Sequence, residues 1–228
     1  MISSLKTSIL FLSGMLVRRI TFRDWAAIDS RESACHFVST RAAFVAQKTL
    51  YGYLKTRMGI RYPTVFQDDV FLTSINIAKL HVYAACLSDL AVFAAARALR
   101  DEPLDDAQRR DLALRCFRQG LDDNAAAFQQ IESFAVADAL RAFQQRLTQV
   151  DWHAGPQGRE LFSLSPAALY HWAPIAPELK QADREIVINS ITFTWRDLRL
   201  QFEKRLNGPA LAADLVRQAA LTDAQPVR

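Results

Sequence analysis

Three residues near the start of the chain, Asp29, Ser33 and His36, are of the types that hydrolytic enzymes use. Their spacings of four and three residues place them on one face of a helix. In a hydrolytic triad, however, the histidine lies between the serine and the aspartate, so that one ring nitrogen takes the hydroxyl proton while the other is held in place. Here the serine lies between the other two, and Asp29 also fits the role of a helix cap. Ser33 and His36 are candidates for an esterase-like site, but a cap followed by polar surface residues is the favoured interpretation.

Other common catalytic signatures are missing from the sequence. No glycine has a serine two positions later, as a nucleophile elbow requires, and there is no HExxH, GxxxxGK[ST] or GxGxxG. The four histidines share no metal-ligand spacing. We therefore predict neither a metal nor another cofactor, and we favour a protein that is not an enzyme.

Further candidates are polar residues on an otherwise apolar stretch. Asn76, Lys79 and Tyr83 share one stripe of a helix there, whereas His81 and Asp89 lie outside that stripe. Buried ionisable groups are usually paired across helix contacts, and the expected partners of Asp89 are Arg41, Arg57 and Arg196. The alternative is a pocket for a ligand or a partner, for which the candidates are Arg57, Arg61, Tyr62, Asn76, Lys79, His81, Tyr83 and Asp89.

The apolar stretch itself, Ile75–Leu99, predicts the architecture. Over residues 80–96 one histidine and one aspartate are the only side chains expected to carry charge, and alanine recurs. A helix that is apolar on every side is normally enclosed by other helices. A membrane span is the alternative, since about 20 residues cross a bilayer, but Lys79 and Asp89 would each cost about 2.5–3.5 kcal/mol inside it. We predict a buried central helix at about 70–100.

Caps divide the rest of the chain into helices. Capping-box patterns begin at Asp29 and Asp105, and Asp68, Ser133 and Ser165 are further predicted caps. An amphipathic pattern follows over 187–206, and no stretch alternates with the period of two that a strand requires. The sequence therefore predicts a single all-α domain, a bundle of six to eight helices around the central one.

The all-α domain is predicted over 21–207, between two segments of different character. The apolar extension at 1–20 is not a typical signal peptide, because Arg18 and Arg19 follow its apolar run instead of preceding it. It is interpreted as a start upstream of the real one, a docked helix or an interfacial anchor. The tail at 208–228 is predicted to be a marginal helix or a frayed end. Three cysteines far apart in the sequence favour a reducing compartment, the cytoplasm.

Charge is unevenly distributed along the chain. The formal net charge is +4, yet residues 1–61 hold ten Lys/Arg and only three Asp/Glu. A basic amino-terminal third suggests an acidic protein partner or an anionic membrane surface; a solvated helix face is the alternative. No RNP-like or helix-turn-helix pattern accompanies the basic residues, so nucleic-acid binding is not expected. The oligomeric state is left open.

Two segments resemble known families. TFRDWAAIDSRESACHFVSTRAAFVAQKTLYGYLKTRMG (21–59) and DDVFLTSINIAKLHVYAACLSDLAVFA (68–94) resemble uncharacterised bacterial proteins, some of them labelled esterase. KTLYGYL, RYP, IAKLHVYAA and ARALRD (48–101) resemble the ubiquinol–cytochrome c chaperone family. The second resemblance implies a helical, membrane-associated and non-enzymatic protein, with Leu80 and His81 in the shared central helix and an assembly role at the inner membrane.

These observations predict a non-enzymatic, chaperone-like interaction or assembly protein. It would act in the cytoplasm or at the inner membrane face, through a protein partner or an anionic membrane surface. The alternative is an esterase-like hydrolase with a non-standard active site.

Overall fold

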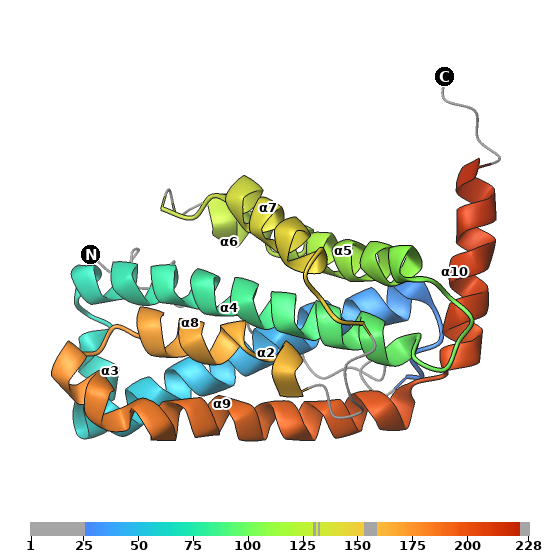
Figure 1. The fold of residues 1–228 in the computed structure, drawn as a ribbon. Helices are drawn as coiled ribbons and strands as arrows, with labels where there is room; N and C mark the ends of the chain where they lie inside the picture. The colour runs from blue at the N-terminus through green and yellow to red at the C-terminus, as the bar shows by residue number, and fades with distance from the viewer. Residues whose placement is uncertain (1–25, 130, 132, 153–158, 224–228) are drawn as a thin grey trace.

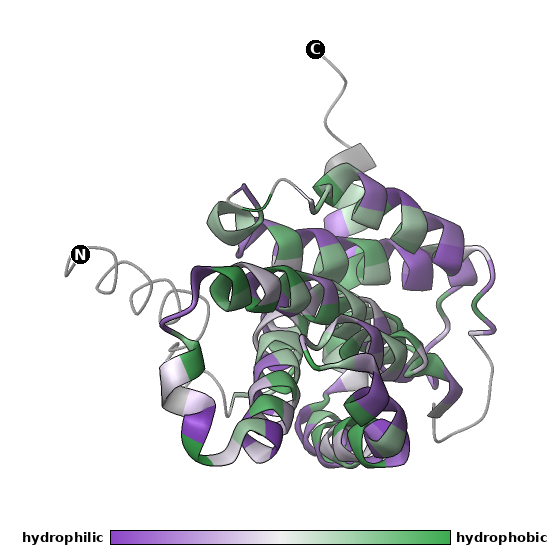
Figure 2. Cartoon of the chain, turned by 90° about the vertical axis from the view of Figure 1, so that its left-hand side faces the viewer, coloured by the Kyte–Doolittle hydropathy of each residue, from purple (hydrophilic) through white to green (hydrophobic). Residues whose placement is uncertain are grey.

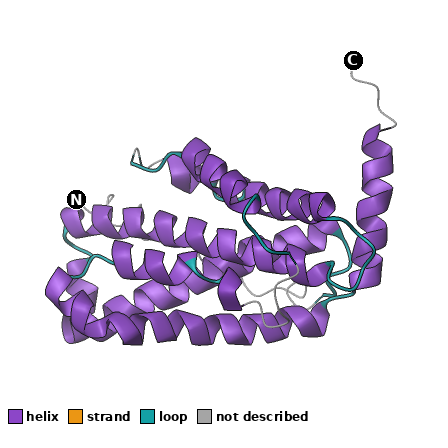
Figure 3. Cartoon of the chain, in the orientation of Figure 1, coloured by secondary structure: helices purple, strands orange, loops and turns teal. Residues whose placement is uncertain are grey.

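The computed structural model describes residues 26–129, 131, 133–152 and 159–223, and its long elements are all helices (Figures 1 and 3). Seven α-helices in this part have nine residues or more, which confirms the predicted all-α class and number of long helices. The elements are α2 (Arg31–Met58), η2 (Gly59–Arg61), α3 (Tyr62–Val65), α4 (Asp69–Ala98), α5 (Asp106–Asp122), α6 (Ala125–Gln129), α7 (Val136–Leu147), η3 (Arg159–Leu161), α8 (Leu164–Trp172), α9 (Pro177–Arg205) and α10 (Gly208–Asp223).

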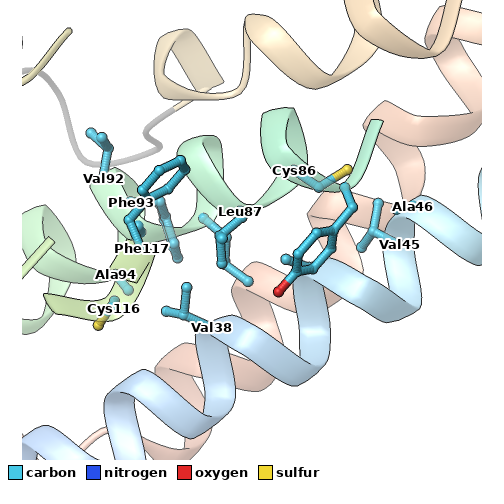
Figure 4. Close-up of a cluster of buried hydrophobic side chains, with 14 of the residues drawn as sticks. Val38, Val45, Ala46, Cys86, Leu87, Val92, Phe93, Ala94, Cys116 and Phe117 are labelled. Atoms are coloured by element: carbon cyan, nitrogen blue, oxygen red, sulfur yellow. The ribbon is translucent and has the colours of Figure 1, made fainter. Parts of the chain in front are cut away.

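Helix α4 is the core of the bundle, as predicted for residues at about 70–100. It packs against α2, α5 and α8, and most of its residues from Ile75 to Ala98 are buried. Figure 4 shows part of this core, where Leu87 and Phe93 of α4 lie near Val38 of α2 and Phe117 of α5. On the outer helices hydrophilic and hydrophobic residues lie side by side (Figure 2). The apolar circumference of α4 is thus explained by helices on several of its sides.

Helix α4 is also long and apolar enough to cross a membrane, judged by length and composition alone. The same composition belongs to a helix at the centre of a bundle, and the neighbours named above cover it here. The proposed extension at 1–20 lies outside the described residues.

Two helix starts follow the predicted cap chemistry, and a third is displaced by one residue. Asp68 accepts hydrogen bonds from the amides of the first turn of α4, and Asp105 opens α5 with a capping box. At α2 the cap is Ser30 and not Asp29. The reason is that Ser30 and Ser33 cap each other reciprocally, which a serine hydroxyl does as both donor and acceptor.

The caps predicted at Ser133 and Ser165 are wrong. Helix α7 begins after Ala135, and α8 begins after Ser163. Ser165 lies inside the first turn of α8, fully buried, and its hydroxyl accepts a hydrogen bond from Trp195 Nε1 at 2.9 Å. The cap of α8 comes from another helix, as described below.

The segment expected to be a marginal tail forms helix α10 through Asp223, in its described part. Leu211 is buried, and Asp214 accepts a hydrogen bond from the Arg31 amide at 2.9 Å. Asp214 therefore supplements the cap of α2 from the other end of the chain. A short parallel β-bridge between Ile28 and Leu206 brings the same two regions together.

Candidate functional site

Asp89, the buried aspartate of α4, provides the cap for helix α8. Its carboxylate accepts hydrogen bonds from the amides of Leu164 at 3.3 Å and Ser165 at 2.8 Å. Arg146 of α7 donates to the same carboxylate at 2.8 Å and also binds the Leu161 carbonyl. Burial raises the pKa of Asp89, while Arg146 and the bonds from Ser165 oppose that rise. The carboxylate is saturated with protein donors, which makes it a structural group.

The predicted partners of Asp89 are therefore wrong. Arg57 pairs with a different carboxylate, and Arg196 lies beside its neighbour Asp197 at 3.6 Å. Arg41 lies over the ring of Phe37, with its Cζ 5.9 Å from the ring centroid. Helical periodicity does not specify which helix packs against the side of α4 that carries Asp89.

Tyr83 is a second buried group satisfied within the bundle. Its hydroxyl donates to the Gly120 carbonyl at 2.8 Å and accepts from Asn124 Nδ2 at 2.9 Å. Burial raises its pKa above the ordinary tyrosine value. Glycine gives this contact room, because a Cβ at position 120 would lie 3.0 Å from the Tyr83 hydroxyl and 2.4 Å from Leu87 Cδ1. Tyr83 thus joins α4 to the end of α5.

Lys79 is buried on α4 with its ammonium 3.4 Å from Oδ1 of the half-buried Asn76. Burial lowers the pKa of Lys79 to about 8, because the charged ammonium is poorly solvated there. The consequence for stability is taken up in the Discussion.

His81 lies in an aromatic cluster. Its ring stacks on Trp172 with centroids 3.6 Å apart and planes 3° from parallel, and it meets Phe134 edge-on. Burial, and then the nearby His171, lower the pKa of His81. The ring therefore favours the neutral form and joins α4 to α8.

Arg57, Arg61 and Tyr62 have different surroundings among the described residues. Arg57 forms a two-pronged ion pair with Asp183 of α9, and Tyr53 donates to the same carboxylate at 2.9 Å. Burial and the Asp183 hydrogen bond raise the pKa of Tyr53 to about 12, whereas the Arg57 hydrogen bond lowers that of Asp183. Tyr62 packs against Phe66, and Arg61 is exposed.

The hydroxyl of Ser33 is occupied by the start of α2. It accepts from the amides of Asp29 and Ser30 at 3.1 and 3.0 Å, and it donates to the Ser30 carbonyl at 2.9 Å. His36 lies half-buried on the same helix. This arrangement gives Ser33 a capping role, in which its hydroxyl is closer to the Ser30 carbonyl than to Asp29 Oδ1, 3.5 Å away.

Removing this cap should therefore affect stability and not hydrolysis. We expect Ser33→Ala to lower the free energy of unfolding by about 1 kcal/mol, measured by urea denaturation. Ser74→Ala is the control, because the Ser74 hydroxyl bonds a carbonyl of its own helix. Hydrolysis of p-nitrophenyl acetate should be the same with and without Ser33. Turnover that disappears in both Ser33→Ala and His36→Ala would contradict the capping role.

Two contacts escaped prediction because they depend on the packing of distant segments. The Sγ atoms of Cys35 and Cys116 lie 3.2 Å apart as buried thiols, although 81 positions separate them in sequence. The ion pair of Asp183 joins α2 to α9 in the same way. Within the described residues no group of His, Cys, Asp and Glu side chains is arranged to hold a metal.

The clearest exposed feature of the candidate regions is one side of α2. Lys48 and Lys55 are exposed, the half-buried Arg41 precedes them at the same seven-residue spacing, and Phe44 lies among them with 42% of its surface exposed. The Lys48 ammonium is 5.6 Å from the centroid of the Phe44 ring. From residue 33 to residue 67 the sequence contains no Asp or Glu. We call Arg41, Phe44, Lys48 and Lys55 the basic face of α2.

The described residues thus define a class: an all-α protein with a central buried helix, whose Tyr83 and Asp89 are hydrogen-bonded within the bundle, and with an exposed basic helix face. No family model, curated protein or solved structure matches the chain.

Proposed function

We propose that this protein is a non-enzymatic interaction protein that binds an anionic membrane surface through the basic face of α2. The observation that carries the proposal is the positive charge of this face without a carboxylate in its own stretch of chain. Basic residues near a bilayer attract anionic headgroups by about 1 kcal/mol each. Lys48 and Lys55 are exposed, so they can approach a headgroup without a change of fold.

Exposed apolar side chains beside the basic residues favour a bilayer over an acidic protein. Phe44 lies within the face, and Ile60, just past the end of α2, is 97% exposed next to the exposed Arg61. An interfacial helix combines apolar side chains with Lys and Arg in this way. The resemblance of residues 48–101 to the ubiquinol–cytochrome c chaperone family supports an assembly role at the inner membrane. No described contact favours the hydrolase alternative.

Vesicle binding tests the proposal. We expect the protein to float with vesicles of phosphatidylcholine and phosphatidylglycerol at low salt, and not with phosphatidylcholine alone. Lys48→Glu combined with Lys55→Glu should weaken binding at least about thirty-fold, given about 1 kcal/mol for each lysine. Arg110→Glu combined with Arg118→Glu is the matched control, because it changes the net charge equally on the exposed side of α5.

Equal losses in the two double variants would mean that only net charge matters and would overturn a site on α2. Absence of binding to anionic vesicles at low salt would overturn the membrane as the partner. In that case a pull-down with the same variants would test an acidic protein.

A further inference from the structure

Helix α9 carries a line of exposed apolar residues on its outer side. Leu179, Ile186, Phe193 and Leu200 are separated by seven residues each, and their surfaces are 47%, 68%, 58% and 61% exposed. The inner side of the same helix is buried and includes a separate apolar set, Val187, Ile191, Trp195, Leu198 and Phe202. The four exposed residues, called here the α9 stripe, therefore have no role in the core.

The spacing of the α9 stripe fits another helix. Seven residues are close to two helical turns, so the four side chains stay on one side of α9. From the first to the last they span roughly 32 Å at about 1.5 Å per residue. Figure 1 shows α9 at the edge of the bundle along its full length. An apolar residue at every seventh position forms one narrow line along α9, which the same line of a second helix can face.

The charged residues beside the α9 stripe argue against an anionic bilayer as the surface that the stripe contacts. Glu178 and Glu185 are exposed in the first half of α9, whereas Arg196 and Lys204 are exposed in its second half. The acids would be repelled by anionic headgroups. Arg184, Asp197 and Glu203 are exposed on α9 as well, so the charge complementarity that favours a second α9 in the opposite direction is that of Glu185 with Arg196.

We propose that the α9 stripe is the contact between two copies of this chain, paired antiparallel about a two-fold axis. In the register that places Leu179 opposite Leu200, Ile186 faces Phe193 of the second copy. Glu185 then lies within two residues of the position opposite Arg196 of the second copy. A parallel pair would place Glu185 beside its own equivalent, which like charges oppose.

The middle of the stripe fits the same pairing. In this register Asn189 lies opposite Ser190 of the second copy, and both side chains are exposed in the single chain. An amide and a hydroxyl can hydrogen-bond to each other, and polar residues within an apolar seam fix register and orientation. A contact limited to one helix is small beside the roughly 800 Å² per partner of standard interfaces. We therefore expect the dimer to dissociate on dilution.

Sedimentation equilibrium of the full chain tests the proposal. We expect a monomer–dimer equilibrium, and Ile186→Glu combined with Phe193→Glu should weaken it at least about a hundredfold, since two large apolar contacts are lost. Val216→Glu combined with Leu221→Glu is the matched control, because it replaces two exposed apolar residues of α10. Far-ultraviolet circular dichroism melts should show that all variants remain folded.

A charge exchange tests the antiparallel arrangement without touching the apolar residues. Glu185→Arg alone and Arg196→Glu alone should each weaken the dimer by roughly three- to tenfold, as for partly exposed pairs that become repulsive. The double variant should restore the dimer to near its original affinity.

A chain that stays monomeric at the highest concentrations overturns the proposal. A dimer whose affinity does not change in the stripe variant, Ile186→Glu combined with Phe193→Glu, overturns it as well. A double exchange that fails to restore affinity overturns the antiparallel register. A monomer that loses vesicle binding only in the stripe variant would identify a bilayer as the occupant instead.

Discussion

Replacing Asp89 with alanine is expected to lower the free energy of unfolding by about 3–5 kcal/mol, the range for breaking a buried ion pair on one side. Two costs combine in this variant. Arg146, whose side chain is 16% exposed, loses its carboxylate, and helix α8 loses the acceptor for its first amides. Urea denaturation followed by far-ultraviolet circular dichroism measures the loss.

A double-mutant cycle separates these two costs. Arg146→Met combined with Asp89→Ala should be less destabilising than the sum of the single changes, because the unpaired arginine is then removed. The control is Asp138→Ala, whose partner Arg141 is exposed, and there we expect less than about 1 kcal/mol. A loss for Asp89→Ala no larger than in this control would show that Asp89 is not the cap of α8.

Replacing Lys79 with methionine is expected to raise the free energy of unfolding, whereas Asp89→Ala is expected to lower it. The pKa of Lys79 is about 8 in the folded chain against an ordinary value of 10.5, so the ammonium is disfavoured by burial. At neutral pH that difference corresponds to as much as about 3 kcal/mol. Methionine keeps the length of the apolar stem without the charge. We expect a higher free energy of unfolding at pH 7.

The pH dependence gives the sharper measurement. Between about pH 8 and pH 10.5 the unfolded chain binds more protons at this lysine than the folded chain, so stability attributable to Lys79 rises with pH in that window. Lys79→Met should remove this rise, whereas Lys204→Met, at an exposed position of α9, should leave it. A variant whose stability increases with alkaline pH as steeply as that of the original chain would contradict the assignment to Lys79.

The proposals for the basic face of α2 and for the α9 stripe can be contradicted independently of each other. Vesicle binding depends on lysines of α2, and self-association depends on apolar residues of α9. A change of vesicle binding with Lys48→Glu and Lys55→Glu says nothing about the dimer, and the α9 stripe variant keeps the basic face of α2 intact.

The sequence by itself determined the elements of the fold where local chemistry is decisive. An apolar stretch without a polar side predicted α4 as the central helix, because such a surface is normally enclosed by other helices and Lys79 and Asp89 disfavoured a membrane span. Asp68 and Asp105 were identifiable as caps, since a cap is formed within one turn of its own helix. The seven-residue spacing of the α9 stripe was also present in the sequence, but exposure is needed to separate it from the core face of the same helix.

Only the tertiary structure decided the partners. Asp89 lies 57 residues from Arg146, and Asp214 lies 183 residues from the Arg31 amide that it caps. Helical periodicity predicts which side of a helix is buried. The packing of the helices decides which side chains of other helices contact that side. For the same reason the predicted site residues Lys79, His81 and Tyr83 lie in separate surroundings, because different sides of α4 are in contact with different helices.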